Sequence, residues 1–149
     1  MKWLMVLVSL SSWSTFARDT KYLLKISDVL MMPEAAGRLD PSVKLFFGPQ
    51  LAPEGEDHGE VVANPKTNSL SQKNKDACRW MMLSGLVELQ TRAKAMGATA
   101  IVGIESNYKK QPFSSETEFE CHAGPLVTGV SLRGEMIRSS GDQVSNATR

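Results

Sequence analysis

The longest regular pattern of apolar positions predicts a helix over residues 72–96. Apolar or small residues recur there at spacings of three and four, the periodicity of one helical face, at Cys78, Met82, Gly85, Leu89, Ala93 and Met96. A second apolar stripe begins at Trp80, Leu83 and Val87. So broad an apolar arc indicates that the helix packs against a sheet and is also covered on another side. Gly97 fits the left-handed position that ends a helix.

Shorter apolar runs predict strands on both sides of this helix. They cover residues 18–26, 43–47, 98–108, 115–123 and 126–136, and the third run is buried over 98–104 and more polar beyond. The last three follow one another closely enough to form an antiparallel meander. Between residues 50 and 71, repeated Pro and Gly predict a long loop. The predicted fold is therefore α+β, with one long amphipathic helix packed on a small antiparallel sheet.

A short N-terminal helix is expected near Pro33. Ser27 and Asp28 can cap its start, and Gly37 is suited to its end. Because Pro33 removes a backbone donor and clashes one turn back, one helical turn on each side of it is favoured over a single long helix.

The first 17 residues have the layout of a secretory signal peptide. Lys2 precedes a short apolar run, and a polar stretch then ends at Ala17, where cleavage is expected. The alternatives are an uncleaved anchor and a buried N-terminal helix. We therefore expect a signal peptide over 1–17, a single domain over 18–138 and a disordered tail over 139–149. The protein would be periplasmic or secreted, with no transmembrane segment after cleavage.

The two cysteines, Cys78 and Cys121, predict a disulfide bond. An exported chain meets an oxidising compartment, and an even cysteine count favours pairing there. Side chains on a strand alternate between its faces, so Phe119, Cys121 and Ala123 can face the long helix, where Cys78 lies. The alternative is a pair of free thiols with a redox or metal role, although the chain has no C-x-x-C motif.

The opposite face of the same strand carries the candidate site. Glu116, Glu118, Glu120 and His122 share it, and carboxylates with an imidazole can bind a divalent metal. His58, in the predicted loop, could supply a further ligand. The predicted metal ligands are therefore His122, Glu120, Glu118 and His58. The competing interpretation is a solvated strand face that binds no metal.

Motifs of the common enzyme classes are missing from the sequence. It contains no phosphate-binding loop, no G-x-S-x-G and no H-E-x-x-H, and it has two histidines in all. Basic and acidic residues number 17 and 16, and the basic ones are scattered, which argues against nucleic-acid binding. We expect a non-enzymatic protein without a cofactor that binds another envelope component. The alternatives are the divalent-metal module and an enzyme with an unrecognised site, which would require a concave polar pocket near His122 or within residues 50–71.

Two resemblances carry further expectations. Residues 91–104, TRAKAMGATAIVGI, resemble the helix-to-strand signature of the YbjQ-like family, which is found in related form in Rcs-type stress-sensor lipoproteins. Most of the chain after residue 17 is similar to a group of small exported bacterial proteins of unknown function, through residues 28–35, 66–68, 77–80, 108–110 and 119–124. These resemblances imply a helix on a small antiparallel sheet and the capacity to form a homo-oligomer. The label "excinuclease ATPase subunit", often given to this group, would require a phosphate-binding loop.

Overall fold

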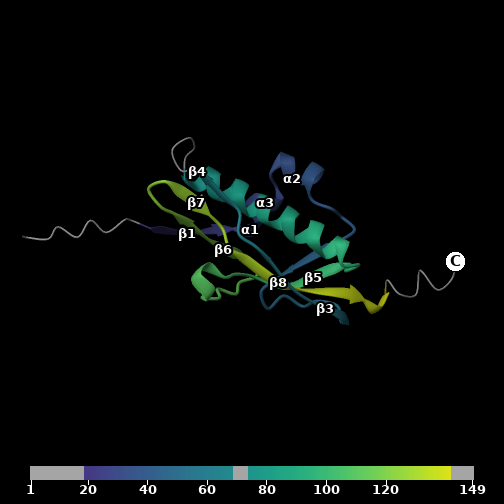
Figure 1. Cartoon of the computed structure of the whole chain (residues 1–149). Helices are drawn as coiled ribbons and strands as arrows, with labels where there is room; N and C mark the ends of the chain where they lie inside the picture. Colours follow the sequence, from purple (N-terminus) through teal and green to yellow (C-terminus); the bar gives the residue numbers. More distant parts are fainter. Residues whose placement is uncertain (1–18, 69–73, 142–149) are drawn as a thin grey trace, which may run out of the picture.

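A computed structural model describes residues 19–68 and 74–141 of the chain. Within these ranges two four-stranded sheets lie against one long helix, so the predicted α+β class is confirmed (Figure 1). The described chain begins and ends at opposite ends of the molecule (Figure 1). The predicted signal peptide, residues 1–17, lies outside the described residues, and so do residues 142–149 of the predicted tail.

The helical elements are α1 (Ile26–Leu30), α2 (Pro33–Arg38), α3 (Asn74–Ala95) and the 3-10 turn η1 (Tyr108–Lys110). The strands are β1 (Thr20–Lys25), β2 (Lys44–Phe47), β3 (Gly55–Ala63), β4 (Lys66–Asn68), β5 (Ala100–Ser106), β6 (Glu118–Ala123), β7 (Val127–Gly129) and β8 (Leu132–Ser139). The two predicted helical turns around Pro33 are therefore present. The first starts at Ile26, before Ser27 and Asp28, and Gly37 lies inside α2 and does not end it.

The single antiparallel sheet of the prediction is replaced by two sheets. Sheet A has the strand order β1-β6-β7-β4 and is antiparallel throughout, whereas sheet B has the order β2-β5-β8-β3 and pairs β2 with β5 in parallel. The predicted strand over 126–136 is divided into β7 and β8. Pro65 lies opposite this break and cannot donate a ladder hydrogen bond, while its carbonyl accepts one from Val130 N at 3.1 Å. The β3–β8 pairing thus passes into the β4–β7 pairing across a bend.

The predicted loop over residues 50–71 is wrong, because β3 and β4 lie within it. β3 is an edge strand of sheet B that pairs with β8, and its first half is mostly exposed and charged. It therefore lacks the apolar alternation that marks a half-buried strand. Its register shifts between Asp57 and Gly59, where Gly59 has a φ of 91°. The glycine that indicated a loop instead forms a bulge.

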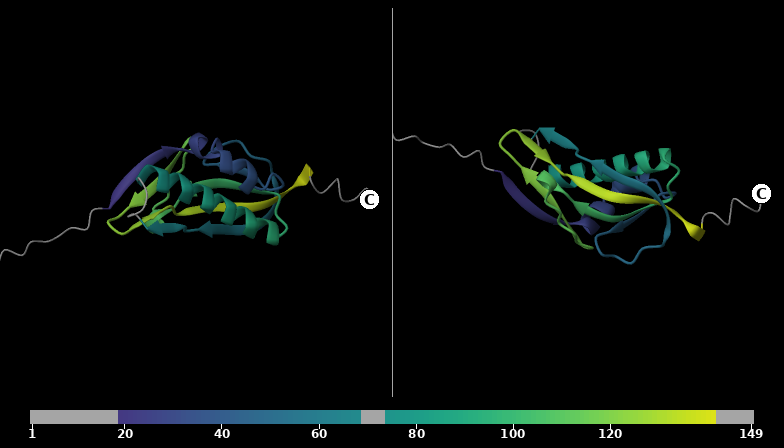
Figure 2. Two further views of the ribbon diagram at one scale, coloured as in Figure 1. Left: turned by 90° about the horizontal axis from the view of Figure 1, so that it is seen from above. Right: turned by 60° about the horizontal axis from the view of Figure 1, so that its bottom comes forward.

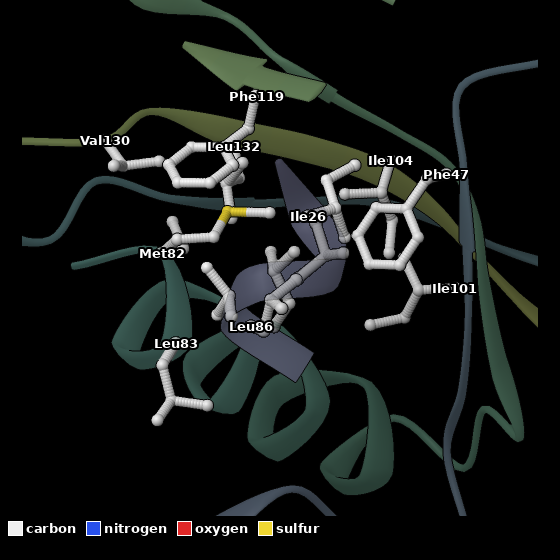
Figure 3. Close-up of a cluster of buried hydrophobic side chains, with 14 of the residues drawn as sticks. Ile26, Phe47, Met82, Leu83, Leu86, Ile101, Ile104, Phe119, Val130 and Leu132 are labelled. Carbon is white, nitrogen blue, oxygen red and sulfur yellow. The ribbon is translucent and has the colours of Figure 1, made fainter. Parts of the chain in front are cut away.

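Helix α3 forms the core by contacting strands of both sheets. Met82, Leu83 and Leu86 are almost fully buried. Figure 3 shows Met82 and Leu86 beside apolar side chains of α1, of the strands and of the link between β7 and β8, namely Ile26, Phe47, Ile101, Ile104, Phe119, Leu132 and Val130. On its other side α3 contacts α1, next to α2 (Figure 2). This arrangement confirms the predicted cover on another side of the helix. Met96, in contrast, is 57% exposed beyond the helix end, where Gly97 adopts a φ of 76°.

Candidate functional site

Strand β6 presents one buried face and one partly exposed face, as its sequence predicts. Phe119, Cys121 and Ala123 are buried, whereas the residues between them are half-buried. Cys121 forms the predicted disulfide with Cys78 of α3, with the two Cα atoms 5.7 Å apart. Both cysteines are completely buried, and the bond between them joins the inner face of β6 to helix α3.

His122 on the outer face lies between two carboxylates. Its Nε2 is 3.1 Å from Glu120 Oε1, and its Nδ1 is 3.5 Å from Asp19 Oδ2. The side chains of His122 and Glu120 are each nearly nine-tenths buried. The ring of Tyr108 stacks on the imidazole, with 3.5 Å between ring centroids and 13° between planes. The histidine ring is therefore held by contacts on both its edge and its face.

Tyr108 completes this cluster by donating a hydrogen bond to Asp19 Oδ2 at 2.7 Å. That hydrogen bond, together with partial burial and the negative charge of Asp19, raises the pKa of Tyr108 above its ordinary value of 10.0. The phenol therefore remains a donor over the whole physiological pH range. We call Asp19, Tyr108, Glu120 and His122 the His122 cluster.

The turn that carries Tyr108 has an unusual backbone. Lys109 and Lys110 adopt φ angles of 50° and 60°, in the left-handed region that non-glycine residues seldom occupy. Backbone hydrogen bonds secure the turn at both ends, from Asn107 N to Ser131 O at 2.9 Å and from Gln111 N to Tyr108 O at 3.0 Å. Strained backbone of this kind persists where surrounding contacts determine it, and here it places Tyr108 over β6.

A cleft of about 470 Å³ adjoins the cluster, in the size range of small-ligand sites. It is lined by Asp19, Tyr108 and His122, by Lys66 and Lys109, and by Val127 near the tip of the β6–β7 hairpin. The strand registers place Gly129 between His122 and Lys66 on this face. A Cβ atom at Gly129 would lie 3.2 Å from both Lys66 Cγ and Pro65 O, so glycine keeps the floor of the cleft open.

The predicted metal ligands are separated by the fold. Glu120 and His122 are adjacent, and Glu118 shares their face of β6. His58 belongs to β3 of sheet B, where its Nδ1 donates to Met96 O at 2.8 Å just beyond α3. Across residues 19–68 and 74–141 no group of three or more His, Cys, Asp or Glu side chains could hold a metal ion. Of the predicted ligands, Glu120 and His122 thus lie together, and the contact that distinguishes their surroundings is the stacked ring of Tyr108.

Three residues of this site, Tyr108, Lys66 and Asp19, are not among the site residues predicted from the sequence. Tyr108 and Lys66 belong to segments that carry the resemblance to the exported bacterial group, and this was their one available signal. Asp19 precedes the first strand, and nothing in its surroundings in the sequence distinguishes it. Its role depends on β1 pairing with β6, a contact between residues about a hundred positions apart.

Comparison of the chain with protein-family models, curated proteins and solved structures found no match in any of the three searches. The YbjQ-like and exported-protein resemblances therefore stay predictions. In the described part of the chain, none of the helices is long and apolar enough to cross a bilayer.

Proposed function

We propose that this chain is an exported, disulfide-stabilised domain that acts by binding another component of the cell envelope, and that the cleft beside His122 is its binding site. The disulfide supports the exported location, because such bonds form in oxidising compartments. The cleft supports a binding role, because it is concave, has both polar and apolar walls, and adjoins a fixed set of side chains.

The observation that carries the proposal is the mutual engagement of the His122 cluster. The phenol of Tyr108 donates to Asp19, and both imidazole nitrogens of His122 face carboxylates. A hydrolytic site needs a nucleophile next to a base that is free to accept its proton. Here the candidate base contacts two carboxylates and lies under an aromatic ring. This arrangement favours a preformed binding wall over a catalytic pair. A concave pocket near His122 is, however, also what the enzyme alternative requires.

The resemblance gives a second line of support. Three of its five segments, 66–68, 108–110 and 119–124, contribute side chains to the cleft. These segments lie on three separate elements, β4, η1 and β6. The fold therefore brings three segments that are distant in the sequence together at one cleft, which supports a site and not three separate surface features.

Photocrosslinking in intact cells tests the binding site. A photoreactive amino acid replaces Val127, which lines the cleft and is 46% exposed. We expect an adduct of defined mass that tandem mass spectrometry assigns to an envelope component. The matched control replaces Leu51, which is 93% exposed and does not line the cleft. The same adduct from both positions, or none from Val127, would argue against the proposal.

Intact-mass spectrometry of the purified protein tests the exported location. Loss of residues 1–17 and resistance of Cys78 and Cys121 to alkylation are the expected results. A full-length protein retained in the cytosol with both thiols reactive would overturn the exported location without bearing on the cleft.

The divalent-metal module stays as a second candidate because Glu120 and His122 are adjacent. It would need a ligand that the fold does not supply from His58. Calorimetric titration with zinc, copper and nickel tests it. Heat of binding that disappears in His122→Ala but persists in His58→Ala would support the module, and the absence of heat at micromolar metal would exclude it.

A further inference from the structure

The charges along the cleft differ from those within the His122 cluster. Lys66 of β4 and Lys109 of η1 both line the cleft, and both are exposed. Neither forms an ion pair with a carboxylate among the described residues, and Lys109 instead has its Nζ 5.3 Å from the centroid of the Tyr108 ring. Asp19, the acidic residue of this cleft, is engaged by Tyr108 and His122. The cleft therefore offers two available cations and an anion that already has partners.

The hairpin tip supplies an apolar wall next to these cations. Pro125 and Val127 line the cleft, and Leu126 between them is 66% exposed. Large apolar side chains that remain exposed beside a polar rim are typical of surfaces that bind another molecule. The open floor at Gly129 connects the apolar wall with Lys66, so that one ligand can reach both.

We propose that the cleft binds a small amphiphile that has an anionic head group. This inference rests on the proposed function and names the chemistry of its ligand. The phosphate or carboxylate head lies between the ammonium groups of Lys66 and Lys109, and the apolar part lies along Pro125 and Val127. Free amphiphiles and membrane lipids share this chemistry, so the experiment must separate the two sources.

Calorimetric titration with octyl phosphate, below the concentration at which it forms micelles, tests the head group. We expect one molecule to bind per chain, with an affinity that falls as salt is added because the charges are exposed. Octyl trimethylammonium has the same chain length and the opposite charge, and should bind at least about tenfold more weakly, the effect expected from losing a charge-assisted contact. Equal binding of the two probes would overturn the proposal.

Two single substitutions then locate the head group. Lys66→Ala and Lys109→Ala should each weaken octyl phosphate binding about tenfold. Both side chains are exposed, so neither change should impair folding, which circular dichroism verifies. The matched control is Lys44→Ala, an exposed lysine on β2 that does not line the cleft. If all three variants bind like the wild type, the head group does not lie between these lysines and the proposal fails.

Vesicle sedimentation distinguishes the two sources of the ligand. Binding to phosphatidylglycerol vesicles that requires Lys66 and Lys109 would identify a membrane lipid as the ligand. Binding of octyl phosphate without vesicle binding would identify a free amphiphile. If crosslinking at Val127 succeeds while octyl phosphate binds to neither wild type nor Lys44→Ala, the proposed function stands and this ligand class is wrong.

Discussion

The outer faces of the two sheets carry similar charged residues but arrange them differently. On sheet A, the turn η1 stacks Tyr108 on His122, and Gly129 leaves room for a cleft beside it. On sheet B, Arg133 has carboxylates on both sides, with Glu105 at 3.0 Å and Glu60 at 3.7 Å. The comparison shows that acidic and basic side chains on a strand do not by themselves make a site. On sheet A, the turn η1 forms one wall of the cleft, and the absence of a side chain at Gly129 leaves space at its floor.

The inner faces are also attached to α3 by different means. Sheet A is held by the disulfide from Cys78 to Cys121. The segment that leads into β2 of sheet B is held by buried Gln90, whose Oε1 accepts from Asp40 N at 2.8 Å. The Nε2 of Gln90 donates to Asp40 O at 2.9 Å and to Val43 O at 2.7 Å. A covalent bond thus links α3 to sheet A, whereas three hydrogen bonds of one buried side chain link α3 to the segment that precedes β2.

Removing the covalent attachment should have the largest effect. Replacing both Cys78 and Cys121 by Ala reopens a loop of 43 residues, which lowers the free energy of unfolding by about 4 kcal/mol on the chain-entropy account. Urea unfolding followed by circular dichroism measures this loss. Hydrogen exchange should show a greater loss of protection in β1 and β6 of sheet A than in β5 and β8 of sheet B.

Reductant supplies the control for this experiment. It should lower the unfolding midpoint of the wild type and leave that of the double variant unchanged. An equal loss of protection in the two sheets would mean that they unfold as one unit, and the contrast between their attachments would then have no energetic meaning.

Removing the polar attachment should have about half that effect. Gln90→Leu keeps a side chain of similar size but leaves the backbone groups of Asp40 and Val43 without their partner, at a cost of about 2 kcal/mol. Urea unfolding measures this change as well. Gln50→Ala is the comparison, since Gln50 Oε1 accepts a single hydrogen bond, from Phe47 N at 3.0 Å. Equal losses of unfolding free energy in the two variants would show that the three hydrogen bonds of Gln90 contribute no more than the single hydrogen bond of Gln50.

The sequence predicted the interior of the molecule better than its surface. The long helix, found over Asn74–Ala95, the strand carrying Cys121 and the disulfide are confirmed, because burial imposes periodic apolar residues on both elements. The polar edge strand β3 has the sequence pattern of a loop, because edge strands need no apolar alternation on their exposed half. The division into two sheets depends on a bend opposite Pro65, which no local pattern reveals.

The candidate site was predicted in part for the same reason. Glu120 and His122 share a strand face, and alternation alone places them together. Tyr108 and Asp19 reach His122 through a left-handed turn and through the pairing of β1 with β6. Contacts between residues so distant in sequence are set by the fold, and a single sequence contains no direct record of them.

The Tyr108–Asp19 hydrogen bond can be isolated by titration. The chain has two tyrosines, so Tyr22→Phe leaves Tyr108 as the one phenol, and its absorbance should titrate above pH 10.0. Asp19→Asn should return this pKa toward 10.0, because the accepting carboxylate and its charge are lost. Since the pKa of the folded state is the higher one, the stability from this bond is complete below pH 10 and is lost as the pH rises through the folded pKa.

Tyr108→Phe measures how much the same hydrogen bond contributes to the free energy of unfolding. At neutral pH the variant should lose about 1 kcal/mol of unfolding free energy, the value typical of a single hydrogen bond. Adding Asp19→Asn to Tyr108→Phe should cost less than Asp19→Asn costs alone, because the Tyr108 hydrogen bond is already lost and only the contact of Asp19 with His122 remains to be removed. Additive losses would indicate that Asp19 and Tyr108 act separately, which would remove the basis for treating the cluster as one unit.

The smallest expected effect concerns the acidic face of sheet B. Burial raises the pKa of Glu135, and the carboxylates of Glu60 and Asp57 raise it further. The folded protein therefore keeps this proton at pH values where the unfolded chain has released it, so stability declines as the pH rises above about 4.5, the ordinary value. Glu135→Gln should remove this decline and stabilise the protein at pH 7 by about 0.5 kcal/mol, the usual scale for like charges on paired strands.

Glu105→Gln is the matched control on the same face and should change stability in the opposite direction. Glu105 lies 3.0 Å from Arg133 Nε, so its neutralisation removes a favourable pair, whereas that of Glu135 removes a repulsion. Thermal unfolding of both variants at pH 4 and pH 7 measures the two signs. If both substitutions destabilise the protein at pH 7, the carboxylate of Glu135 also has a net favourable interaction with its neighbours, as the carboxylates around His122 do. The two outer faces would then differ in shape and not in charge balance.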